Sequence, residues 1–178
     1  MIVLMAGLPG TGKTTLAREL ALRSSGRVLG KDEIRHALFL PEEIEYSTRQ
    51  DDFCLQLMLD TAAYLLKNNS KLTVFLDGRT FSRTYQIENV VNRAESLHQS
   101  WQIIECVCPE DLAKQRLEQQ HGEHPAGNRN FQLYLKVRES FEAITRPKLV
   151  IDTSARMETC IQRAMSALLS GDRSPLVP

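Results

Sequence analysis

Short apolar segments alternate with amphipathic segments along most of this chain. Residues 1–6 (MIVLMA), 72–76 (LTVFL) and 101–108 (WQIIECVC) are apolar runs of strand length, and shorter runs occupy 27–30 and 148–151. Runs of this length between turn-forming residues are typical of buried strands. The pattern therefore predicts five strands at these positions.

Between these runs, apolar residues recur every three or four positions, as on helices with one buried face. The capping box Ser47-Thr48-Arg49-Gln50 begins the longest of the predicted helices. Its predicted inward face consists of Phe53, Cys54, Leu57, Met58, Thr61, Ala62 and Leu65. The full pattern predicts helices at 15–23, 36–40, 47–67, 82–97, 109–121, 131–145 and 154–168.

Strands that alternate with helices predict an α/β fold, in which helices cover both faces of a parallel sheet. Right-handed crossovers then place ligand sites at the carboxyl ends of the strands. We expect a single domain over residues 1–170 and a tail at 171–178. We expect a lid at about 121–138, because glycine and proline interrupt the apolar periodicity where it begins.

Composition narrows the classes of function. The 178 residues include 22 Lys and Arg and 22 Asp and Glu, so the formal net charge is zero. Proteins that bind extended duplex DNA usually carry a basic excess, and we do not expect that activity here. No apolar run reaches the 18 residues of a membrane span, and no secretory signal is recognisable. We therefore expect a cytoplasmic protein.

Residues 7–14 (GLPGTGKT) fit G-x-x-x-x-G-K-[ST], the P-loop pattern, between a predicted strand and a predicted helix. Glycines let successive backbone N–H groups point into one concavity, and the helix directs its positive end at the same anion. Lys13 is expected to reach the β- and γ-phosphates of ATP, and the Thr14 hydroxyl to bind Mg²⁺. The predicted nucleotide-binding residues are Gly10, Thr11, Gly12, Lys13, Thr14 and Thr15.

Asp32 lies two residues after the second predicted strand, and Arg35 comes three residues later. A hydroxyl that accepts a phosphoryl group needs a carboxylate to orient it and take its proton, and we predict this role for Asp32. The planar guanidinium of Arg35 would hold an anionic or polar group of the acceptor. The structural alternatives are a helix N-cap for Asp32 and a surface position for Arg35.

Asp77 ends the third predicted strand, where P-loop proteins hold Mg²⁺ through a carboxylate. The alternative is a turn formed by Asp77-Gly78. Arg79 and Arg83 come next, and the sequence leaves open whether they face the acceptor or the solvent.

Three further arginines flank or occupy the predicted lid. Arginines that a closing lid brings to the γ-phosphate neutralise the charge that develops there. We predict this role first for Arg116 and then for Arg129. A solvated position is the stronger expectation for Arg138.

Together these segments resemble one group of P-loop kinases. GLPGTGKTTLA, KDEIR, VFLDG and IDTS are similar to motifs of the group that contains polynucleotide 5′-hydroxyl kinases, chloramphenicol phosphotransferases and zeta toxins, over about residues 1–170. The resemblance implies a three-layer P-loop fold with strand order 2-3-1-4-5. It also implies that Asp32 is the general base, Arg35 the acceptor-binding arginine and Arg116 a nucleotide-contacting arginine.

The sequence thus predicts an enzyme, an ATP-dependent phosphotransferase that uses Mg²⁺. The acceptor is a hydroxyl of a small molecule or of a nucleic-acid 5′ end, and the sequence does not choose between them. The alternative is a nucleotide-binding switch or ATP hydrolase that regulates a partner protein. No N-K-x-D or LSGGQ-like sequence supports that alternative.

Overall fold

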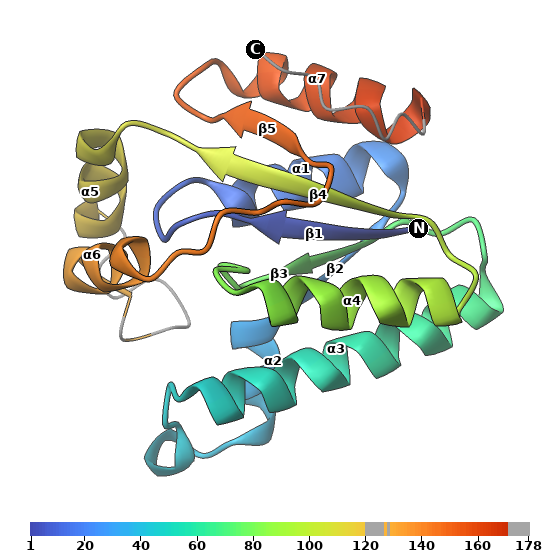
Figure 1. The fold of residues 1–178 in the computed structure, drawn as a ribbon, viewed down its shortest axis with the longest axis horizontal. Helices are drawn as coiled ribbons and strands as arrows, with labels where there is room; N and C mark the ends of the chain where they lie inside the picture. The colour runs from blue at the N-terminus through green and yellow to red at the C-terminus, as the bar shows by residue number, and fades with distance from the viewer. Residues whose placement is uncertain (120–126, 128, 171–178) are drawn as a thin grey trace.

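The sheet has five strands, and all neighbouring strands run parallel in the order β2-β3-β1-β4-β5. This computed structural model describes residues 1–119, 127 and 129–170. The arrangement, shown in Figure 1, confirms the predicted α/β fold and strand order. The strands are β1 (Ile2–Ala6), β2 (Arg27–Gly30), β3 (Val74–Asp77), β4 (Trp101–Val107) and β5 (Leu149–Asp152).

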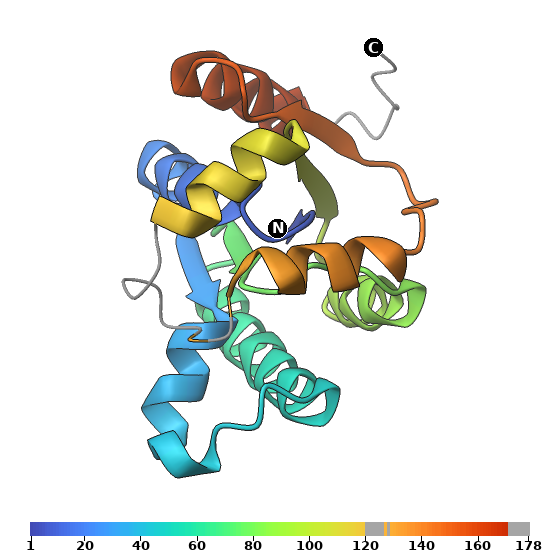
Figure 2. The ribbon, with the colours of Figure 1, turned by 90° about the vertical axis from the view of Figure 1, so that its left-hand side faces the viewer.

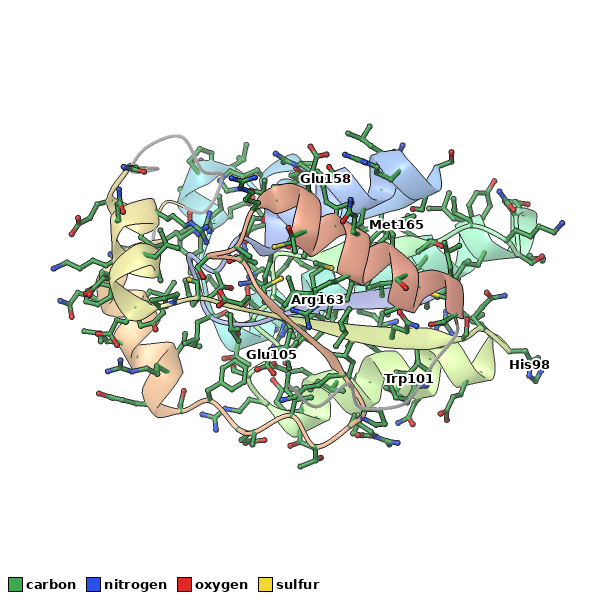
Figure 3. All side chains as sticks on the ribbon, turned by 90° about the horizontal axis from the view of Figure 1, so that it is seen from above. His98, Trp101, Glu105, Glu158, Arg163 and Met165 are labelled. Carbon is green, nitrogen blue, oxygen red and sulfur yellow. The ribbon has the colours of Figure 1, made fainter. Side chains whose placement is uncertain are left out.

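Helices cover both faces of the sheet. In Figure 1, α1 and α7 lie on one face and α3 and α4 on the other, while Figure 2 looks onto α5 and α6. An ion pair between Glu158 of α7 and Arg23 of α1, 2.9 Å long, joins two helices of one layer; Figure 3 labels Glu158. The helices are α1 (Lys13–Ser24), α2 (Lys31–Leu38), α3 (Thr48–Asn68), α4 (Thr84–Ser96), α5 (Glu110–Gln119), α6 (Phe131–Glu139) and α7 (Met157–Ser170), with a 3₁₀ turn at Pro41–Glu43.

β1 is buried on both faces because it lies in the middle of the sheet. Ile2, Leu4 and Ala6 pack with α3 and α4, whereas Val3 and Met5 pack with α1 and α7. This two-sided burial explains why the strand reads as a continuous apolar run rather than an alternating one.

Several predicted boundaries were wrong. The helix from Phe131 ends at Glu139, not at 145, because the chain then crosses to α4. There the Glu142 N–H donates to the Ser82 carbonyl at 2.9 Å, and Ile144 enters the core. The third strand covers Val74–Asp77 rather than 72–76, and the helix expected at 36–40 already begins at Lys31.

The predicted inward face of α3 was partly wrong. Cys54, Met58 and Ala62 are buried as expected. Phe53, however, is 51% exposed, and Leu55 and Leu59 point into the core instead. The helix carries apolar residues on two adjacent faces, so periodicity alone could not decide which of them would meet the sheet.

Residues 120–126, 128 and 171–178 lie outside the described part of the chain, so the predicted tail and much of the predicted lid lie there too. The described part of the lid segment comprises Gly127, Arg129, Asn130 and most of α6. None of the described helices combines the length and the apolarity needed to cross a membrane.

The corrected face of α3 makes a stability prediction. Leu59→Ala removes a fully packed side chain, and we expect it to lower the free energy of unfolding by about 2–5 kcal/mol. Leu57→Ala is the matched control, because Leu57 is only half-buried, and we expect a loss of about 1 kcal/mol. Urea denaturation of both variants measures the difference. Equal losses of stability in the two variants would contradict the burial of Leu59 and the partial exposure of Leu57.

Candidate functional site

Residues 7–12 form a turn between β1 and α1 that only glycine permits at its key positions. Gly7 and Gly10 have φ angles of 126° and 80°. A Cβ atom would lie 2.3 Å from the Cys106 carbonyl oxygen at the first position and 2.7 Å from that of Ala113 at the second. Gly12 is the N-cap of α1, and no side chain caps this helix. The first N–H groups of α1 are therefore available to an anion.

A cavity of about 540 Å³ lies against this turn. Gly10, Gly12, Thr14 and Thr15 line it, as the P-loop motif predicts for a phosphate site. The other lining residues include Gly30, Asp32, Asp77, Gly78 and Thr153 near the ends of the neighbouring strands, Arg116 of α5, and Arg129, which precedes α6.

Lys13 is buried beneath the turn. Its Nζ donates to the carbonyl oxygens of Gly7, at 2.8 Å, and Leu8, at 2.7 Å. Burial lowers the pKa of Lys13 to about 8, although the nearby Asp77 carboxylate favours the charged form. An anion bound at the turn would compete with the carbonyls for this ammonium group and would favour its protonation.

Asp77 has the features of a metal ligand. Its side chain is buried, and Oδ1 has no hydrogen-bond partner within the described residues. Thr14 lines the same cavity. Mg²⁺ is usually bound by one or two protein oxygens together with phosphate oxygens and water. The donor set fits Mg²⁺, and no group of three His, Cys, Asp or Glu residues in the described chain forms another metal site.

Arg116 is held against the turn by a residue that the sequence analysis missed. Its guanidinium donates to Oγ1 and to the carbonyl oxygen of Thr153, at 2.9 and 2.8 Å. The Thr153 hydroxyl also lies 3.0 Å from the Thr11 carbonyl. Thr153 directly follows β5, and Asp32 lies two residues after β2. The rule that site residues follow strand ends would have selected it.

A second cavity, of about 620 Å³, lies beside the first. Its lining residues come from the P-loop and the start of α1, from α2, the start of α3, the segment from β3 into α4, and α6. Both cavities are lined by Thr14, Asp32, Gly78 and Arg129. The two spaces therefore meet at the predicted base and at one predicted arginine.

Asp32 lies in the first turn of α2 but does not cap it. The N-cap is Gly30, and no side chain caps the helix. Instead, Oδ1 of Asp32 accepts a hydrogen bond from Arg35 at 2.6 Å and lies 3.4 Å from Lys31 Nζ. The carboxylate is buried and lines both cavities.

Arg35 is completely buried, not at the surface. Its guanidinium lies between Asp32 and Asp51 and donates to both carboxylates. It also lies 5.2 Å from the centre of the Tyr46 ring. The sequence analysis missed Asp51 and Tyr46, because only the fold brings the start of α3 against α2.

The remaining arginines lie at different places relative to the two cavities. Arg129 is half-buried between the cavities; burial lowers its pKa, and the nearby Asp77 and Asp32 oppose that effect. Arg79 is buried in the wall of the second cavity, and Arg83 lies at that cavity's edge and pairs with Glu142. Arg138 lines neither cavity and pairs with Glu110 of α5.

Comparisons with known proteins identify one matching family and several structures of similar fold. The sequence profile of the AAA domain family matches residues 2–144, and no curated protein matches the chain. A gluconokinase from Sinorhizobium meliloti is 14% identical, with a TM-score of 0.69 over 95% of this chain and 91% of its own. The Mycobacterium tuberculosis APS kinase CysC, in complex with AMPPNP and APS, is 15% identical, with a TM-score of 0.71 over 94% and 96%.

A third similar structure is Chaetomium thermophilum Kti12 in complex with ADP-AlF3. It is 12% identical, with a TM-score of 0.69 over 96% of this chain and 98% of its own. At these identities the likeness establishes a shared fold.

The lowered pKa of Lys13 predicts that nucleotide binding takes up a proton in alkaline solution. With a pKa of about 8, roughly nine-tenths of Lys13 is neutral at pH 9, and bound phosphate should restore its charge. We expect an uptake of about 0.9 proton per AMPPNP at pH 9, about 0.1 at pH 7, and an affinity that falls as the pH rises above 8. Calorimetry in buffers of different ionisation enthalpy measures this uptake.

Lys13→Arg is the control for that measurement, because a guanidinium stays charged at pH 9. Any nucleotide that it binds should bind without proton uptake. Wild-type protein that takes up no proton at pH 9 would contradict the assignment of this pKa to the phosphate-binding lysine.

Proposed function

Since this chain belongs to the AAA domain family, we propose that it is an ATP-dependent phosphotransferase, carried by one domain over residues 1–170. It transfers the γ-phosphate of ATP to a hydroxyl of a second substrate. The observation that carries this proposal is the pair of cavities that meet at Asp32. A switch protein or simple hydrolase needs only the cavity beside the P-loop, whereas transfer needs a second space that opens onto the first.

The nucleotide occupies the cavity beside residues 7–15. The N–H groups of the turn and of α1, with Lys13, bind the phosphates, and Arg116 contacts them from α5. Thr14 and Asp77 hold Mg²⁺, which neutralises negative charge on the phosphate oxygens. We place this activity in the cytoplasm, where ATP is available.

The acceptor hydroxyl approaches from the second cavity. Its oxygen forms a bond to the γ-phosphorus, the bond from phosphorus to the β–γ bridging oxygen breaks, and ADP leaves. The hydroxyl proton passes to Asp32. We assign that proton to Oδ2, because Arg35 already donates to Oδ1. Arg129, between the cavities, neutralises charge on the transferred group.

In this proposal Arg35 positions the base rather than binding the acceptor. Its guanidinium is already engaged by Asp32 and Asp51 and is completely buried. A planar cation held on two sides fixes the orientation of the Asp32 carboxylate. Asp51 in turn positions Arg35, so it acts on the base indirectly.

Asp32→Asn tests the base. Asparagine keeps the size of the side chain and can orient a hydroxyl, but it cannot accept the proton. We expect nucleotide affinity close to that of the wild type and transfer to a hydroxyl reduced by at least about a hundredfold. Asp111→Asn is the matched control, an exposed aspartate in the first turn of α5 outside both cavities.

Loss of transfer in both variants to the same degree would contradict a special role for Asp32. Retention of the wild-type rate in Asp32→Asn would remove Asp32 from the mechanism. Melting temperatures of the two variants separate these outcomes from a loss of folded protein.

Turnover of ATP with and without an acceptor tests the proposal as a whole. A panel of alcohols with γ-labelled ATP should yield a labelled product, and ATP consumption should rise when that acceptor is present. The alternative, a switch or hydrolase, predicts the same slow turnover with every member of the panel. Lys13→Ala should remove most nucleotide binding in either case, so it tests nucleotide binding without separating the two alternatives.

A further inference from the structure

We propose that the second cavity takes a small alcohol that carries an anionic group of its own, a carboxylate or a phosphate, and that Arg79 binds this group. The inference rests on the proposed function and names the class of its acceptor. The residues that support it line the side of the cavity away from the P-loop.

The lining of the second cavity is strongly basic within a chain of zero net charge. Seven Lys and Arg residues line it against three acidic ones. Asp32 and Asp51 among those acids are engaged with Lys31 and Arg35. A cleft with a local excess of one sign of charge concentrates ligands of the opposite sign.

Arg79 is a buried basic residue of this wall whose charge is only partly compensated. It directly follows Gly78 and is only 4% exposed. Its Nη2 forms an ion pair with Asp52 at 2.6 Å, but Nε and Nη1 have no acceptor within the described part of the chain. A guanidinium stays charged when buried, and buried N–H groups without acceptors are unfavourable. An oxygen anion is the ligand that would satisfy them.

The side chain of Tyr85 contacts Arg79 and is held only by weak hydrogen bonds. It is 44% exposed, and its hydroxyl makes only long contacts: 3.4 Å to Arg79, 3.2 Å to Asp52 and 3.5 Å to Gln86. Hydroxyl hydrogen bonds are usually 2.7–2.8 Å long. An anion that enters the cavity reaches Arg79 when Tyr85 moves aside, and it replaces weak contacts with charge-assisted ones.

Gln86 adds a second polar group to the same wall. Its side chain is buried, and Oε1 lacks a donor among the described residues. An acceptor that has a hydroxyl as well as an anion can serve both residues, the anion at Arg79 and the hydroxyl at Gln86. Its other hydroxyl then faces Asp32 across the cavity.

The shape of the cavity favours a small molecule over a nucleic-acid end. Its volume of about 620 Å³ is within the range of small-molecule pockets, and Leu133 and Val137 of α6 form one wall. Proteins that bind single strands stack bases on aromatic rings along a groove. In this cavity Arg35 already lies over the Tyr46 ring, so that face of the ring is not free for a base to stack on.

Binding of inorganic phosphate tests the anion site directly. The protein is first saturated with Mg²⁺–AMPPNP, so that the P-loop is filled, and phosphate is then titrated by calorimetry. We expect phosphate to bind the wild type and to bind Arg79→Gln at least tenfold more weakly. Arg79→Lys, which keeps the charge but loses the planar fork, should fall between them. Melting temperatures show that each variant is folded.

Arg93→Gln is the matched control. Arg93 also has an unpartnered Nε and one carboxylate partner, Asp60, but it lines neither cavity. Phosphate should bind this variant as it binds the wild type. Absence of phosphate binding in the wild type, or equal binding in Arg79→Gln, would overturn the inference. Failure of AMPPNP itself to bind would instead overturn the proposed function.

Activity with matched alcohols tests the same site in turnover. Glycerol, glycerate and glycerol phosphate differ in the anionic group. We expect kcat/KM to be at least about a hundredfold higher for an anionic member than for glycerol, and Arg79→Gln to remove most of this preference. Equal rates for neutral and anionic members would overturn the inference. So would a 5′-hydroxyl oligonucleotide that reacts faster than a nucleoside 3′-monophosphate.

Discussion

The close approach of backbone to backbone at the end of β1 constrains the rest of this structure. Gly7 leaves β1 so near to β4 that a Cβ atom would lie 2.3 Å from the Cys106 carbonyl oxygen. The turn that follows buries Lys13 and leaves the first turn of α1 without a side-chain cap. β1 must therefore be the central strand, and α1 must pack directly on it, as Leu16, Ala17 and Leu20 do.

Parallel pairing then brings distant residues to this one edge of the sheet. Gly30, which ends β2, pairs with Asp77, which ends β3. Val107, which ends β4, pairs with Asp152, which ends β5. All crossovers return to the same edge, because every neighbouring pair is parallel, and so the P-loop, Asp32, Asp77 and Thr153 meet there although they span most of the chain.

The first turn of α3 organises the second cavity. Asp51 accepts hydrogen bonds from Arg35 and Lys31, and the next residue, Asp52, forms an ion pair with Arg79. Two consecutive carboxylates thus hold two buried guanidinium groups that come from different segments. Burying such charges is unfavourable unless partners compensate them. Arg35 has two carboxylates and Arg79 has one, which is why the two arginines are assigned different roles.

The sequence by itself determined that five strands alternate with helices and that Asp32 and Asp77 lie near strand ends, whereas the strand order was implied by the resemblance to P-loop kinases. Apolar runs can be recognised in the sequence because strands that are buried on both faces require them. The P-loop can be recognised because glycine alone tolerates the backbone conformation of its turn. Only the tertiary structure decided which face of α3 is buried, where α6 ends, and that Arg35 lies between two carboxylates. Apolar periodicity does not show which neighbour a face will meet.

Contacts between α2 and α3 join residues far apart in the chain, and no local pattern encodes them. The second cavity depends on such contacts, since its lining residues come from segments as far apart in the chain as the P-loop, α2, α3, α4 and α6. Arg79 is the plainest case: its sequence position was equally compatible with a solvated arginine. Packing against Asp52 and Tyr85 made it a buried cation, two of whose nitrogen atoms have no partner among the described residues, because side-chain burial is a property of the assembled fold.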